Sequence, residues 1–274
     1  MLNRNELEIF YNETFKTDLK PGKWSSADNP YRKFWYPLQF PVATRDKSDS
    51  KMCRLGTENI KVENQTMTLT ATDNGKEYCG TELRTNELYL YGYFEIKARL
   101  KTSAGICPAF WLLSEENSNN AVAYEADVFE CFDNLVGGAL IGHKALMPDW
   151  SHRTTFGGFK LERITDEPSP VKDFQSVQQF FKGNWREEYH IFGFDWKPDA
   201  LTWYIDDVPV MSAALPEYEP GKRHFCLPMR VILTQYSGVN VWPLGEKVSK
   251  KTDWENGNSM EIEYIRFYNR KQML

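Results

Sequence analysis

The chain has 274 residues, of which 26% are charged and 41% hydrophobic, and its formal net charge is −5. This composition is typical of a folded globular protein and excludes a disordered chain. The acidic balance, with only a short basic stretch at residues 247–251, argues against a nucleic-acid partner. No run of residues approaches the length of an apolar membrane span. We therefore expect neither a nucleic-acid nor a membrane partner.

The five cysteines are odd in number, widely spaced and without a metal-ligand pattern. We expect them to serve mainly as small buried hydrophobic side chains, with one or two disulfides as the alternative. The N-terminal residues lack the basic start and the apolar stretch of a signal peptide. Either the protein is cytoplasmic, or a leader was removed before residue 1.

Alternation of apolar and polar residues, interrupted by turns, recurs along the chain and predicts β-strands. A hairpin is predicted over Asn59–Thr72, and a long strand within Leu88–Lys101 places Phe94, Ile96 and Ala98 on one face. The later predicted strands are residues 189–195, 201–205, 208–211, 229–236 and 260–269. Many short strands with regular turns indicate an all-β fold, either a sandwich or a barrel.

Helical periodicity is weak throughout the chain. The best helix candidate is Asp173–Lys182, which is followed by a glycine. It closes a segment at about 150–185 that is rich in glycine, proline and charge. We interpret this segment as a surface excursion of a single domain that spans residues 1–274.

Residues 123–132, AYEADVFECF, place three acids among residues that favour strands. On a regular strand Glu125 and Asp127 share one face, and Glu130 points to the other. A lone carboxylate buried in an apolar core is costly. We therefore predict a β-bulge between Asp127 and Glu130, which would return Glu130 to the acidic face. All three carboxylates would then project into one groove.

Such a groove suits the hydrolysis of glycosidic bonds. In retaining glycosidases two carboxyl groups lie about 5–5.5 Å apart, and one attacks the anomeric carbon while the other protonates the leaving oxygen. Repulsion within a cluster of carboxylates helps one of them to keep a proton near neutral pH. From the spacing alone, a solvated acidic face and a calcium site are the alternatives.

With this motif the chain resembles glycoside hydrolase family 16, the laminarinase-like enzymes with a concanavalin-A-like jelly roll. Residues 125–130 match the family's E-x-D-x-x-E motif. Further matches follow the family's order: YGYFEIKAR at 91–99, PAFWLL at 108–113, FDWKPD with WYID at 194–206, and EIEYIRFY at 261–268. The matches run from about residue 58 to residue 268, and they imply a β-sandwich jelly roll.

The resemblance implies that Glu125 is the nucleophile, Glu130 the acid/base and Asp127 their helper. It also implies substrate-binding side chains, and the candidates are Trp111, His143, Trp242, Arg84 and Trp150. It requires no cofactor, although a structural calcium ion is compatible with the fold. The expected partner is a polysaccharide, the expected state a monomer, and the expected location extracellular or periplasmic.

Three departures from the family pattern leave the acids intact but put the substrate in doubt. Cys107 stands where family members commonly have tryptophan, Glu263 stands where the closing strand usually has aspartate, and the segment at about 150–185 is longer than the family pattern leads us to expect. The leading hypothesis is a retaining, endo-acting hydrolase of a β-1,3- or mixed β-1,3/1,4-glucan. The alternatives are the same machinery on a marine galactan (agar, porphyran or carrageenan), a transglycosylase, and a non-catalytic sugar-binding module.

Overall fold

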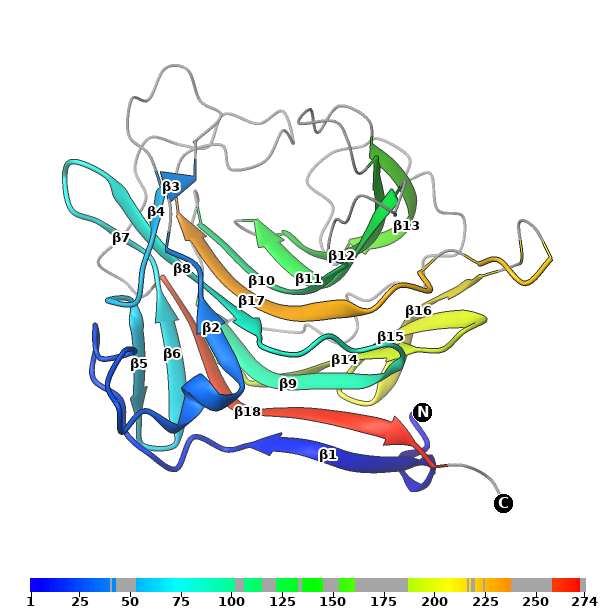
Figure 1. Cartoon of the computed structure of the whole chain (residues 1–274), viewed down its shortest axis with the longest axis horizontal. Helices are drawn as coiled ribbons and strands as arrows, with labels where there is room; N and C mark the ends of the chain where they lie inside the picture. The colour runs from blue at the N-terminus through cyan, green and yellow to red at the C-terminus, as the bar shows by residue number, and fades with distance from the viewer. Residues whose placement is uncertain are drawn as a thin grey trace.

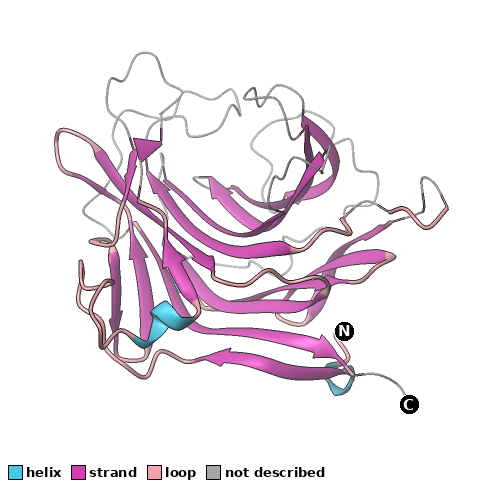
Figure 2. Cartoon of the chain, in the orientation of Figure 1, coloured by secondary structure: helices cyan, strands magenta, loops and turns pink. Residues whose placement is uncertain are grey.

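The computed structural model describes residues 1–39, 41–42, 53–101, 106–114, 122–132, 135–144, 153–160, 187–215, 217, 220–223, 225–237 and 258–271. At residues 41–42, 53, 122–123, 132, 135–144, 153–160 and 237 only the backbone is described. Strands dominate, and the described helices are two short 3₁₀ turns, η1 (Arg4–Glu6) and η2 (Pro30–Lys33) (Figure 2). The predicted all-β class is confirmed.

Within the described residues the strands form two sheets that pack face to face as a sandwich (Figure 1). The eight-stranded sheet has the order β16 (Val208–Ala214), β15 (Ala200–Ile205), β14 (His190–Trp196), β9 (Gly92–Lys101), β18 (Ser259–Arg270), β6 (Thr66–Thr70) and β5 (Ile60–Glu63), with β1 (Leu7–Glu13) paired to β18.

The second sheet has ten strands and curves so that its outer face is concave (Figure 1). Its order is β13 (Arg153–Lys160), β12 (Leu135–Lys144), β11 (Val122–Phe132), β10 (Ile106–Ser114), β17 (Met229–Ser237), β8 (Tyr78–Thr85), β4 (Cys53–Leu55) and β3 (Pro41–Val42), with β2 (Trp35–Pro37) and β7 (Thr72–Asp73) paired to β8. We call it the concave sheet. The described pairings in both sheets are antiparallel except β4 with β8, which is parallel.

The predicted strands are confirmed, with one correction. β5 and β6 form the predicted hairpin, and its two turn residues, Asn64 and Gln65, both have positive φ, as a two-residue turn between twisted strands requires. The strand predicted from Leu88 begins only at Gly92. Tyr91 has φ 65° and Gly92 has φ 127°, so the chain turns there instead of continuing as a strand.

The core lies between the two sheets. Phe94, Ile96 and Ala98 point into it and are fully buried, as their alternation predicts. From the concave sheet, Phe129 meets Phe192 of β14 with ring centroids 4.5 Å apart. Removing this apolar surface from water holds the two sheets together and fixes which face of each strand remains outside.

The segment predicted as a surface excursion is only partly described. Residues 153–160 form β13, which pairs with β12 at one end of the concave sheet. These residues therefore extend the sheet. The helix candidate Asp173–Lys182 lies outside the described residues.

The cysteines follow the prediction in part. Cys79, Cys107 and Cys131 are buried free thiols. The prediction is wrong for Cys226, which is also a free thiol but is exposed, because it lies in the irregular segment that precedes β17. For Cys53 only the backbone is described.

Candidate active site

The three acids of β11 all point to the concave face of their sheet. Opposite residues of antiparallel strands share a face, and the pairs between β10 and β11 are Ala109 with Glu130, Trp111 with Asp127, and Leu113 with Glu125. The three β10 residues alternate along their strand and therefore lie on one face. The acids opposite them must lie on that face as well.

One extra residue in β11 makes this possible. Phe110 pairs with Phe129 and Trp111 pairs with Asp127, so Val128 has no opposite residue on β10. The register against β12 shifts at the same place, between Asp127 and Glu130. The predicted bulge is therefore confirmed.

The other face of β11 belongs to the core. Ala126, Val128, Phe129 and Cys131 are all buried within the main hydrophobic cluster. Without the extra residue, Glu130 would point into this cluster, where an unpaired carboxylate is strongly disfavoured. With the bulge, β11 keeps an apolar inner face and places all three acids on its outer face.

The three acids differ in their exposure. Glu125 is 4% exposed and Asp127 is 2% exposed, whereas Glu130 is partly open to solvent. A ligand that lies along the concave face can therefore reach Glu130 most readily. Of the two more enclosed acids, Asp127 lies one pleat and Glu125 two pleats further along the strand.

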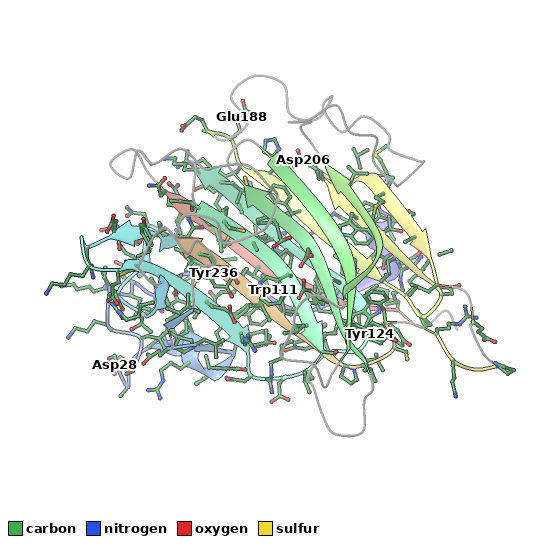
Figure 3. All side chains as sticks on the ribbon, turned by 90° about the horizontal axis from the view of Figure 1, so that it is seen from above. Asp28, Trp111, Tyr124, Glu188, Asp206 and Tyr236 are labelled. Atoms are coloured by element: carbon green, nitrogen blue, oxygen red, sulfur yellow. The ribbon has the colours of Figure 1, made fainter. Side chains whose placement is uncertain are left out.

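Trp111 lies directly beside Asp127 in the neighbouring strand β10. Its ring is half-buried, and its indole N–H donates to the hydroxyl oxygen of Thr234 at 2.8 Å. Thr234 is on β17, so the bond crosses the strand boundary and holds the plane of the indole in place. Figure 3 looks onto the concave sheet and shows Trp111 and Tyr236 in its central part.

Arg84 of β8 points to the same face. It pairs with Ile232, which in turn pairs with Trp111. Three strand spacings of about 4.8 Å separate β8 from β11, so Arg84 lies roughly 14 Å from Asp127 across the sheet. The structure thus places two of the predicted substrate-binding residues, Trp111 and Arg84, in one row with Asp127.

Arg84 belongs to a network that the sequence did not reveal. Its Nε donates to Glu82 at 2.6 Å, and the Tyr236 hydroxyl donates to the other oxygen of the same carboxylate. Glu82 is fully buried. Burial works against the charge of Arg84, but the Glu82 carboxylate outweighs it and raises the pKa of the guanidinium. The sequence did offer one indication of the pair: Glu82 and Arg84 are two residues apart on one strand and therefore share a face.

Cys107 lies on the same face, opposite Tyr236. Cys107 is 1% exposed. Burial, together with the nearby charge of Glu130, raises its pKa well above the ordinary value for a thiol. Cys107 therefore remains protonated and supplies neither a nucleophile nor an aromatic surface for a sugar ring.

The remaining candidates are not placed as side chains. His143 belongs to β12 opposite Ala123, where only the backbone is described. Trp150 and Trp242 lie outside the described residues. In the described part of the chain, no group of three or more His, Cys, Asp or Glu side chains could hold a metal ion. Among the same residues, no helix has the length and apolarity to span a membrane.

Two carboxyl groups on one face of a sheet, as Glu125 and Glu130 are here, are the groups that a glycoside hydrolase needs on either side of the bond it cleaves. The model of the family "Glycosyl hydrolases family 16" matches residues 47–266. The chain belongs to this family of glycoside hydrolases.

Individual relatives are distant. The glucan endo-1,3-beta-glucosidase of Cryptopygus antarcticus is 24% identical over 201 residues, which cover 70% of this chain and 67% of that protein. The beta-glucanase of Rhodothermus marinus is 25% identical over 48% of this chain, but the match spans only 42% of that protein. Among solved structures, the non-specific endo-beta-1,3(4)-glucanase SCLam has a TM-score of 0.67 at 18% identity, with 99% of this chain and 94% of that chain covered.

Proposed function

We propose that this protein is a retaining, endo-acting hydrolase of a β-1,3- or mixed β-1,3/1,4-glucan. The observation that carries the proposal is the bulge in β11, which brings Glu125, Asp127 and Glu130 to one face of the concave sheet. The names of two relatives, a glucan endo-1,3-beta-glucosidase and an endo-1,3-1,4-beta-glycanase, support the substrate class. Because the substrate is a polysaccharide, we propose that the protein acts outside the cytoplasm.

In the proposed reaction Glu125 is the nucleophile. Its carboxylate attacks the anomeric carbon while Glu130 gives a proton to the leaving oxygen, which yields a covalent glycosyl-enzyme. Glu130 then takes a proton from the water that releases the sugar. The accessibility of Glu130 supports its role as the proton donor, since the glycosidic oxygen and later the water must both reach it. Asp127, between the two on the same face, would hold Glu125 in position.

The row from Asp127 to Arg84 supports binding of an extended chain. Trp111 would offer its ring to the sugar beside the acids, and Arg84 would donate to sugar hydroxyls further along the concave face. Glu82 and Tyr236 would hold the guanidinium of Arg84 toward the groove. A site of this length favours cleavage within a polymer rather than at its end.

The test is reducing-end release by purified protein on laminarin, lichenan, cellulose, agarose, porphyran and carrageenan. We expect cleavage of laminarin or lichenan. Glu125→Gln and Glu130→Gln should each lower kcat by roughly a thousandfold or more, since each removes one of the two reacting carboxyls. The anomeric proton signal of the first product, followed by NMR, should have the β configuration of a retaining enzyme.

The control is Glu263→Gln. Glu263 departs from the family pattern, but it lies on β18 of the eight-stranded sheet, is half-exposed and pairs with Lys97 at 2.6 Å, so it does not bear on the concave face. This variant should keep wild-type activity. Cleavage of a galactan alone would replace the proposed substrate, and full activity of Glu125→Gln would refute the proposed mechanism. Binding to one polymer without cleavage of any would point to a sugar-binding module.

A further inference from the structure

Trp203 connects the opposite sheet to the carboxylate strand. It belongs to β15 in the eight-stranded sheet, yet its indole N–H donates to the main-chain carbonyl of Asp127 at 2.9 Å. Trp203 is 1% exposed and Asp127 is 2% exposed, so the bond is shielded from water. The indole ring also packs against Phe194 of β14 with ring centroids 5.0 Å apart, which limits its movement.

This hydrogen bond is important because it is made directly beside the bulge in β11. A bulge interrupts the regular ladder of hydrogen bonds between strands, and Asp127 is the last residue before the extra one. A shift in register by a single residue moves side chains to the opposite face. If the extra residue lay before Asp127 instead of after it, Asp127 would point into the core while Glu125 and Glu130 stayed outside.

We propose that Trp203 is a positioning residue for the hydrolysis. Its indole holds the carbonyl of Asp127, keeps the extra residue of β11 at Val128, and so holds the carboxyl groups in one register. The inference rests on the proposed function, because Trp203 acts only through Glu125, Asp127 and Glu130. Displacement of a reacting group by about 1 Å can cost on the order of a hundredfold in rate, so a single bond at this place can matter.

The chain offers a matched control. Trp196 of β14, the strand next to β15, is also 1% exposed, and its indole donates to the carbonyl of Phe225, again at 2.9 Å. Phe225 packs against Tyr124 at the start of the described part of β11, with ring centroids 4.7 Å apart, but it is not part of the bulge. Trp196→Phe therefore removes the same ring, the same kind of bond and a similar share of the core.

The experiment compares Trp203→Phe with Trp196→Phe on the polymer that the wild type cleaves. Both variants should lose thermal stability to a similar extent. Trp203→Phe should lower kcat about tenfold or more, with KM within about twofold of the wild type, and should shift the pH dependence of kcat/KM. Trp196→Phe should keep kcat within about twofold and leave the pH dependence unchanged.

Equal losses of kcat in the two variants, or a wild-type kcat in Trp203→Phe, would overturn the inference. If Trp203→Phe does not fold, replacement of the Trp203 side chain by benzothienylalanine keeps the ring shape and removes only the N–H donor, with the same expectations. An active Glu125→Gln enzyme would overturn the proposed function and this inference with it. An inactive Glu125→Gln beside an unimpaired Trp203→Phe overturns this inference alone.

Discussion

Removal of the Arg84 guanidinium should destabilise the protein because it leaves the charge of Glu82 buried. Glu82 is fully buried, and its partners on the concave face are Arg84 at 2.6 Å and the Tyr236 hydroxyl. Breaking a buried ion pair by removing one partner costs about 3–5 kcal/mol. Because Arg84 itself is 23% exposed, we expect the lower end, about 3 kcal/mol, for Arg84→Met.

The assay is thermal and urea unfolding. The entropy of unfolding is about 2.1 cal/mol/K per residue, or about 0.6 kcal/mol/K for this chain, so about 3 kcal/mol lowers Tm by about 5 °C. The double variant Glu82→Gln/Arg84→Met should recover about 2 kcal/mol of that loss, since a buried amide is neutral and still accepts from Tyr236. The recovered double variant should nevertheless show a raised KM on the polymer.

An Arg84→Met variant within about 0.5 kcal/mol of the wild type would refute this reasoning. It would mean that the remaining groups around Glu82, among them the Tyr236 hydroxyl, compensate for the loss of Arg84. A double variant that stays as unstable as Arg84→Met would show that lost packing of the arginine stem, and not the stranded charge, is the cause.

Two further predictions concern the eight-stranded sheet. Gly193→Ala should lower the free energy of unfolding by about 1–3 kcal/mol, as measured by urea unfolding. A Cβ at this position would overlap the hydroxyl of the fully buried Tyr93 and lie 2.8 Å from its Cζ. Adding Tyr93→Phe to the same chain should recover part of the loss. Burial of Glu261 opposes its charge, but Arg99 and Lys101 outweigh burial and lower its pKa. The unfolded chain then binds the proton more tightly, so this contribution is complete above about pH 4.3 and is lost as pH falls further. As the pH falls below about 4.3, Glu261→Gln should lose about 1 kcal/mol less of its free energy of unfolding than the wild type, measured by denaturant titration. An equal loss in the two proteins would contradict this.

The bulge and the acidic face of β11 could be predicted because they depend only on the spacing of three acids within six residues, Glu125 to Glu130. Two acids at a spacing of two residues share a face, and a third at an odd spacing must either enter the core or be returned by an extra residue. The cost of burying Glu130 decides between these, and the structure confirms the bulge. The apolar face of β9 was readable for the same reason, since Phe94, Ile96 and Ala98 alternate with polar residues.

Other features of the same strands could not be read in this way. Glu95 lies on the polar face of β9, where alternation predicts contact with water, yet it is fully buried. Arg4, from the N-terminal end of the chain, pairs with it at 2.8 Å, and Tyr268 donates to it at 2.9 Å. Both partners are far from Glu95 in the sequence, so the residues around Glu95 indicate neither of them.

The sequence by itself thus determined the predicted strands, the faces of β11 and the three acids, because side-chain alternation and the cost of a buried charge act over a few residues. The tertiary structure alone decided which distant residues meet. Tyr236 and Glu82 are 154 positions apart, and Trp203 and Asp127 are 76 apart. These contacts depend on the order of strands within each sheet and on the packing of one sheet against the other. A local pattern of polar and apolar residues does not carry that information, because many strand orders bury the same faces.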